Sequence, residues 1–195
     1  MRKVTFILIV FSFILTGCSY LLNAPTKTFE DEFKNTKTHT LAQTFRPDEL
    51  TSEIISATVT FSRIITNSNE NVNVYFVINR STSSFRVDKK GFMKANDNRF
   101  ELISEPEGSE LKSRQESSTT STTTKDSTSV KTTYTTDVKN INWYDDKFMV
   151  QLTPEMVEAI LKTDELLFRF YFGPEQATFR LKGKKLQQVK NLFEK

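Results

Sequence analysis

Few residues in this chain of 195 could carry out chemistry. The sequence holds one cysteine, Cys18, and one histidine, His39. A Ser-His-Asp or Cys-His catalytic set needs a histidine beside its nucleophile, and zinc sites want three or four ligands from histidine, cysteine and acidic residues. His39 stands between Thr38 and Thr40 in a polar segment. We therefore expect a solvated histidine there, and neither a catalytic set nor a metal site.

The densest group of chemically capable side chains is Trp143-Tyr144-Asp145-Asp146. Aromatic rings beside carboxylates can line a sugar site, and two carboxyl groups at a set separation can hydrolyse a glycosidic bond. The plainer interpretation is a strand end, with Trp143 in the core and Asp145, Asp146 and Lys147 forming a turn. We favour that interpretation and keep the four residues as a speculative binding cluster. No catalytic residue and no metal ligand is predicted.

The N-terminal residues combine a positive start with an apolar run. Arg2 and Lys3 precede residues 4–15, which are almost wholly apolar. A charged start, a short apolar stretch and small residues before a cut site are typical of an export signal. A spanning helix needs about 20 apolar residues, which is more than this run supplies. Residues 1–17 are thus predicted to be a cleaved signal peptide, with an uncleaved anchor or an ordinary secretory signal as alternatives.

The motif Leu15-Thr16-Gly17-Cys18 resembles the lipobox of bacterial lipoproteins. In that family the cysteine thiol receives a diacylglyceryl group, signal peptidase II cuts before it, and the new amino terminus is usually acylated. The resemblance implies lipidation of Cys18, a cleavage motif of Leu15, Thr16 and Gly17, and no other cofactor. Several acyl chains, at about 0.8 kcal/mol per buried methylene, would anchor the protein firmly.

The same resemblance implies a location. In lipoproteins of two-membrane bacteria, aspartate directly after the cysteine favours the inner membrane, whereas this chain has Ser19. We expect a bacterial cell-envelope protein anchored in the outer membrane and facing the periplasm.

Composition bounds the class of the mature protein. Removing residues 1–17 from the 195 leaves 178, and removes two of the 27 basic residues and none of the 24 acidic ones. The remaining 25 basic and 24 acidic residues give a nearly neutral chain, which does not indicate nucleic-acid binding. Residues 18–45 are predicted to be the lipidated cysteine and a tether, and residues 46–195 a single domain.

Alternating side chains predict strands through most of that domain. Residues 55–65 place apolar side chains on one face, with Arg63 as the exception, and residues 72–78 do the same after the turn at 66–69. Phe148, Val150 and Leu152 alternate later in the chain. The next strand carries Phe168, Phe170 and Phe172, and Phe179 and Leu181 are expected to pair with it.

Two short helices are expected among the strands. Thr153-Pro154 supplies an N-cap and a first-turn proline for one helix. Residues 184–194 repeat apolar side chains at helical spacing and predict an amphipathic C-terminal helix. Together these elements predict a mainly β protein, an antiparallel β-sandwich with two short helices.

Residues 117–136 form a low-complexity stretch in which 15 of 20 residues are serine or threonine. Few apolar residues are available there to offset the entropy of ordering. Threonine is nevertheless β-branched, and Val130, Thr132, Tyr134 and Thr136 alternate. We expect a solvent-exposed flexible loop or hairpin over about residues 109–137.

The order of elements after Phe92 is similar to that of uncharacterised β-rich envelope lipoproteins. The matching segments are residues 148–152, 166–172 and 177–181. They are core patterns, so the resemblance supports the fold and implies no activity.

The prediction is therefore a lipid-anchored envelope protein with a non-catalytic binding or scaffolding role. Its partners would be the membrane, through the anchor, and an envelope protein or glycan. One alternative is a hydrolase of envelope glycans that uses Asp145 or Asp146. Another is an inhibitor that presents the Ser/Thr-rich loop to an envelope enzyme.

Overall fold

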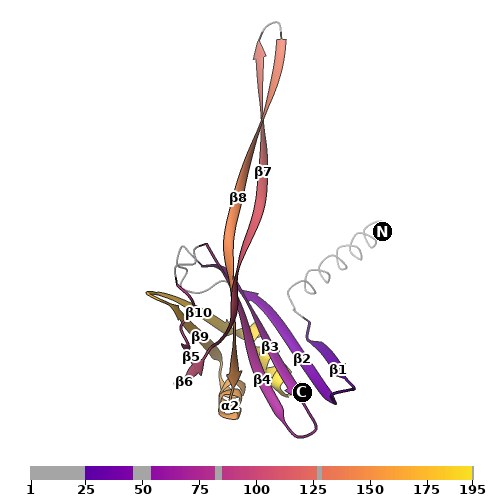
Figure 1. Ribbon diagram of the computed structural model, residues 1–195, viewed down its shortest axis with the longest axis vertical. Coiled ribbons are helices and arrows are strands. Elements are labelled where there is room, and N and C mark those ends of the chain that lie inside the picture. Colours follow the sequence, from indigo (N-terminus) through magenta and orange to yellow (C-terminus); the bar gives the residue numbers. More distant parts are fainter. Residues whose placement is uncertain (1–24, 46–53, 82–84, 127–128, 195) are drawn as a thin grey trace, which may run out of the picture.

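The computed structural model describes residues 25–45, 54–81, 85–126 and 129–194 (Figure 1). These residues form two antiparallel sheets that face each other, with two helices beside them. The elements are β1 (Lys27–Asp31), β2 (Thr36–Phe45), β3 (Ile54–Ile65), β4 (Glu70–Arg80), β5 (Lys90–Ala95), β6 (Asn98–Ile103), β7 (Glu105–Asp126), β8 (Ser129–Leu152), α2 (Pro154–Lys162), β9 (Glu165–Phe172), β10 (Glu175–Lys182) and α3 (Gly183–Glu194).

One sheet has six strands in the order β1-β2-β3-β4-β8-β7, and the other has four in the order β10-β9-β5-β6. The chain passes from the second sheet to the first at Ser104, between β6 and β7. Ser104 is buried, and its amide and hydroxyl donate to the carbonyls of Lys89 and Asp88 at 2.8 and 2.7 Å. The predicted mainly β, sandwich-like fold with two short helices is confirmed.

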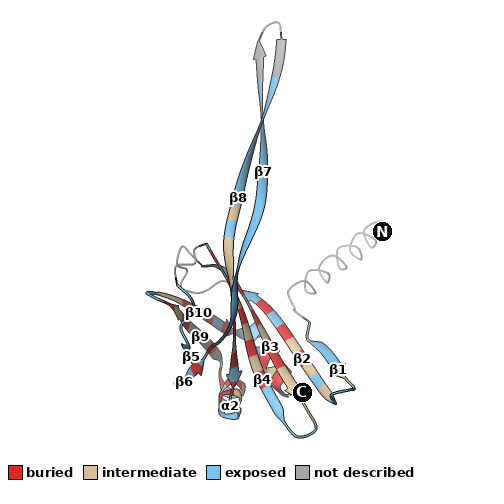
Figure 2. Ribbon diagram, in the orientation of Figure 1, coloured by how far each residue is buried: buried red, intermediate tan, exposed pale blue. Residues whose placement is uncertain are grey.

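A group of phenylalanines joins the two sheets, and we call it the phenylalanine core. The ring of Phe76 on β4 lies 5.0 Å from that of Phe148 on β8 and 4.7 Å from that of Phe170 on β9. Phe168 and Phe179 lie 5.5 and 6.0 Å from Phe76. Such pairs contribute about 0.5–1.5 kcal/mol each beyond burial. The predicted inward faces of these strands are confirmed, and Figure 2 shows buried residues along both sheets.

The inward face of β3 departs from the prediction at its start. Ile54 is buried and Ile55 is 48% exposed, whereas the alternation placed Ile55 inside. The pairing with β4 runs from Ile54 opposite Arg80 directly to Ser56 opposite Asn79. Ile55 is the extra residue of a bulge, and a bulge exchanges the faces on either side of it.

Both helices lie where the sequence predicts them, and both bury an apolar face. The Thr153 hydroxyl accepts a hydrogen bond from the Met156 amide at 3.3 Å, and Pro154 occupies the first turn of α2. Helix α3 packs against β2 and β3 of one sheet and β9 and β10 of the other. It therefore bridges the two sheets on the side where β2 and β10 lie. Its buried residues are Leu186, Val189, Leu192 and Phe193.

The predicted tether, residues 18–45, is too long, because residues 27–45, about two thirds of it, belong to the six-stranded sheet. β1 begins at Lys27 and pairs with β2, which pairs in turn with β3. His39, expected to be solvated, is 7% exposed, and its Nδ1 lies 2.9 Å from Thr28 Oγ1. The sheet thus starts nine residues after Cys18, which at full extension reach about 30 Å.

Gly91 is the second residue of β5. A Cβ atom on Gly91 would lie 2.5 Å from Cδ1 of Phe170 and 2.9 Å from the Arg169 carbonyl. The glycine is therefore needed because a core ring crosses the β5 backbone at close range.

We expect Gly91→Ala to lower the free energy of unfolding by about 1–3 kcal/mol, since the added methyl group must displace the Phe170 ring. Chemical denaturation of both proteins measures this difference. Lys90→Ala, at the exposed neighbouring position, is the matched control and should change stability by less than about 0.5 kcal/mol. Equal stability of Gly91→Ala and the parent would contradict the close approach.

Candidate functional site

The most prominent surface feature is the long hairpin of β7 and β8 (Figure 1). β4 pairs with β8 only as far as Tyr144, which also faces Leu111 of β7. Beyond that point the described chain continues as two strands alone, which we call the ribbon, residues 112–126 and 129–143. At about 3.3 Å per residue the ribbon extends about 50 Å from the sheet.

The ribbon is mostly polar, although Tyr134 and Val138 are exposed on one of its faces. The described side chains at 112–123 and 132–140 are all exposed, as Figure 2 shows. Threonines opposite each other pair through their hydroxyl groups, with Oγ1 atoms 3.2 Å apart for Thr119 and Thr136 and 3.3 Å apart for Thr123 and Thr132. The stretch for which we expected a flexible loop or hairpin is a regular hairpin, because β-branched threonine favours strands.

The predicted binding cluster lies where the ribbon leaves the sheet, in the middle of β8. It forms neither a turn nor a strand end, which corrects the favoured interpretation. Tyr144 and Asp146 share the inward row with Phe148, while Trp143 and Asp145 point to the opposite face. Trp143 is half-buried and is not in the core. The four side chains therefore do not converge on one site.

Asp146 forms a buried ion pair with Arg80 of β4. The two residues are 3% and 2% exposed, and the carboxylate accepts a hydrogen bond from Arg80 Nε. The Arg80 guanidinium also lies over the Phe172 ring, 4.6 Å from its centroid. The Asp146 carboxylate is therefore inaccessible to solvent and is occupied by an ion pair within the protein.

Asp145 faces a surface network on the other side of the sheet. Glu110 of β7 lies opposite Asp145 in the strand pairing. Its carboxylate lies 2.7 Å from Lys112 Nζ and 2.8 Å from Lys147 Nζ. Hydrogen bonds from Lys112 and then Lys147 lower the pKa of Glu110 to about 2. Because the pKa is lowered, the attraction is present above pH 4.5 and is lost as the pH falls towards 2. Asp145 Oδ1 is buried and has no hydrogen-bond partner among the described residues.

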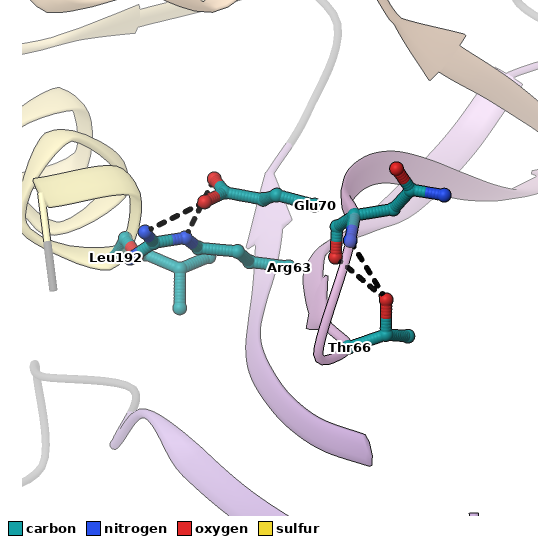
Figure 3. Close-up of polar contacts among 5 residues, drawn as sticks. Arg63, Thr66, Glu70 and Leu192 are labelled. Atoms are coloured by element: carbon teal, nitrogen blue, oxygen red, sulfur yellow. Dashed lines mark hydrogen bonds and ion pairs between the residues drawn. The ribbon is translucent and has the colours of Figure 1, made fainter. Parts of the chain in front are cut away.

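The two arginines in apolar strands find different partners. Arg63 donates to both carboxylate oxygens of Glu70, at 2.8 and 3.0 Å, and to the Leu192 carbonyl at 3.4 Å (Figure 3). It therefore caps the C-terminal end of α3, where backbone carbonyls favour a cation. Beside it, Thr66 and Asn69 close the predicted turn between β3 and β4 (Figure 3).

Arg169 lies on the outward face of the four-stranded sheet and lines a groove of about 400 Å³ that is open to solvent. We call this the basic groove. Three of its residues are cationic, two are aromatic and none is acidic. They are Phe92, Lys94, Arg99, Leu167, Arg169, Tyr171 and Thr178.

The guanidinium groups of the basic groove are held by their neighbours. Arg169 Nε donates to Thr178 Oγ1 at 2.9 Å. The Arg99 guanidinium lies 3.9 Å from the centroid of the Phe92 ring, whose edge-on neighbour is Tyr171 at 6.2 Å. Of these residues only Arg169 stands out in the sequence, as an arginine between Phe168 and Phe170 of an otherwise apolar strand.

Other functional expectations fall outside the site or outside the described residues. The lipobox, Leu15, Thr16, Gly17 and Cys18, precedes the first described residue. No helix in the described ranges is long and apolar enough to cross a membrane. Those ranges also hold no cluster of three histidine, cysteine or acidic residues suited to a metal ion.

We expect Asp146→Ala to destabilise the protein by about 3–5 kcal/mol, because Arg80 would remain buried without its counter-ion. Urea unfolding monitored by circular dichroism measures the change. The double variant Arg80→Met/Asp146→Leu removes both charges and should be more stable than the single variant. Asp145→Asn is the matched control and should lose far less. A single variant as stable as the parent would rule out the ion pair as a structural tie.

Comparisons with known proteins supply no relative for this chain. No protein-family model matches it, and neither a curated protein nor a solved structure was found to match. The arguments about function therefore rest on the sequence motif and on the geometry described above.

Proposed function

We propose that this chain is a lipid-anchored protein of the bacterial cell envelope that binds an envelope protein through the ribbon, without catalysis. The observation that carries the proposal is the ribbon itself. It extends about 50 Å from the sheet and exposes two strand edges along its length.

The free edges suit recognition by strand addition. An unpaired edge offers a row of backbone donors and acceptors to which another strand can bind. A two-stranded hairpin without an apolar face is only marginally stable alone, so a third strand would stabilise it. Residues 117–123 are all serine or threonine, so this part of the ribbon is polar and carries no charged side chain.

The predicted anchor would hold this surface close to a membrane. Acylation of Cys18 follows from the resemblance to the lipobox, and the sheet begins at Lys27. The two sheets would then lie within about 30 Å of the bilayer, and this distance is shorter than the length of the ribbon. Outer-membrane placement facing the periplasm remains part of the proposal, on the basis of Ser19.

The two alternatives fare differently. A hydrolase that uses Asp145 or Asp146 gains no support from the geometry, since Asp146 is buried against Arg80 and the two carboxylates point to opposite faces of β8. The inhibitor hypothesis is favoured by the ribbon, because an exposed hairpin could occupy an enzyme cleft. It is one form of the protein binding proposed here.

The anchor predicts a defined mature product. Intact-mass measurement of the protein purified from its native host should give a chain that lacks residues 1–17 and carries acyl groups on Cys18. Cys18→Ala should remain uncut and lose the acyl mass. A product that retains Met1, or that bears an unmodified thiol, would contradict the anchor.

The ribbon predicts a contact that depends on its length. Replacing residues 119–136 by Asn-Gly joins Ser118 to Asp137, which already face each other, through a two-residue turn. This shortened variant should fold with the parent's stability, since the removed residues lie outside the core. In the native host it should lose the crosslinked partner bands that the parent gives.

A matched control keeps the ribbon at full length. Replacing Ser117, Ser118 and Ser121 by threonine preserves polarity and strand preference, so the crosslinks should persist. Equal crosslinking by the shortened variant would exclude the ribbon as the binding surface.

A further inference from the structure

We propose that the tip of the β1–β2 hairpin inserts Phe33 into the lipid bilayer, so that the molecule stands on the membrane with the ribbon directed away from it. The leaflet that receives the ring is the one that would hold the anchor. This inference rests on the anchor of the proposed function, but it does not depend on which protein the ribbon binds.

The first argument is the exposure of two phenylalanines on this hairpin. Phe33, in the turn between β1 and β2, is 100% exposed, and Phe29 on β1 is 67% exposed. Transfer of a phenylalanine ring from water to hydrocarbon is favourable, because its apolar surface leaves water. The fold leaves the Phe33 ring wholly in water, so a bilayer would stabilise it.

The second argument is that the turn holds Phe33 at the tip. The Asp31 carboxylate accepts hydrogen bonds from the amides of Phe33 and Lys34, at 3.0 and 3.2 Å. Asn35 has a φ of 48°, in the left-handed region that asparagine tolerates in turns. Because the turn is already formed, insertion of the ring requires no rearrangement of the backbone and costs little conformational entropy.

The third argument is the charge of the hairpin. Residues 27–37 contain three lysines and three acidic residues, so their net charge is zero. Glu30 and Lys37 form an ion pair across the two strands, with 2.6 Å between the carboxylate and Nζ. A neutral hairpin is not drawn to an anionic surface as a basic segment is. Insertion would therefore depend on the phenylalanines and would occur in zwitterionic lipid.

The fourth argument is the position of the hairpin relative to the ribbon. β2 begins where β3 ends, with Lys37 opposite Ile65. β8 ends at this same end of the sheet, where Leu152 faces Val72 near the start of β4. The ribbon leaves the sheet at the opposite end, beyond Tyr144. The tip and the ribbon therefore point in opposite directions, as Figure 1 shows.

The chain before β1 is long enough for the anchor and the tip to reach the same leaflet. Phe33 lies six residues after Lys27, which is about 20 Å along a strand. Lys27 in turn lies nine residues after Cys18, which reach about 30 Å at full extension. An acylated Cys18 can therefore lie at the depth of the Phe33 ring.

The test measures the depth of a tryptophan at the tip. The Phe33→Trp variant of the full chain, purified from its native host, is placed in phosphatidylcholine vesicles whose acyl chains carry bromine. Bromine quenches tryptophan that it contacts. The only tryptophan of the parent is Trp143, and the parent's emission is subtracted. The probe at position 33 should lose most of its emission relative to ordinary phosphatidylcholine.

A matched probe tests the direction of the ribbon. Tyr134 is likewise an exposed aromatic residue, at 71%, but it lies on the ribbon. Tyr134→Trp should keep its emission in the brominated vesicles, since the ribbon would project away from the bilayer. Both changes exchange one exposed aromatic side chain for another, and thermal unfolding at the parent's temperature verifies that each variant is folded.

The intact mass of the same sample separates this proposal from the anchor. An acylated protein whose probe at position 33 keeps its emission overturns the insertion and leaves the anchor standing. A protein without acyl groups that floats with the vesicles, and whose probe is quenched, supports the insertion and contradicts the anchor. A protein without acyl groups that does not float contradicts both.

Two further results would overturn the proposal. Quenching at both positions would show that the molecule lies along the membrane surface. Blue-shifted emission at position 33 without quenching would show that protein covers the ring, and dimers on crosslinking would then identify a second copy of the chain as the occupant.

Discussion

The contact of Phe76 with rings from the opposite sheet is the constraint on which the rest of the structure depends. Phe76 touches Phe148 within its own sheet and Phe168 and Phe170 across the interface. Because side chains alternate along a strand, fixing Phe168 and Phe170 inward turns Arg169 outward. The basic groove is thus set by the packing of the core behind it. In the same way, Phe148 fixes the strand that continues into the ribbon.

Much of the fold could be predicted because local patterns and long-range packing agree. The alternation in β4, β8 and β9 and the N-cap of α2 all reappear in the structure. β2 was missed because its inward row is His39, Leu41 and Gln43, of which only one is apolar. That row packs beside α3, where Gln43 Nε2 donates to the Lys185 carbonyl at 3.0 Å. A strand whose inward side chains are mostly polar and pack beside a helix shows no hydrophobic alternation, so its sequence pattern does not predict it.

The candidate sites could be predicted less well, because both depend on strand pairing. Asp146 suggests a turn when its neighbours alone are considered, yet its partner Arg80 lies 66 positions away. Phe92, Arg99 and Thr178 each resemble ordinary outward residues of separate strands. Only the order β10-β9-β5-β6 brings them to one groove. The bulge at Ile55 had no local signal either, since the apolar pair Ile54-Ile55 fits either face.

The unbroken course of β8 has a mechanical consequence. The same strand forms one arm of the ribbon, pairs with β4 in the core and ends one residue before α2. Its hydrogen bonds to β4 lie across the strand axis, so tension applied to the ribbon along that axis strains these bonds in shear at once. Bonds strained together resist far more than bonds opened one after another. A pulling force on the ribbon would thus be transmitted to the core without bending β8 where it leaves the sheet.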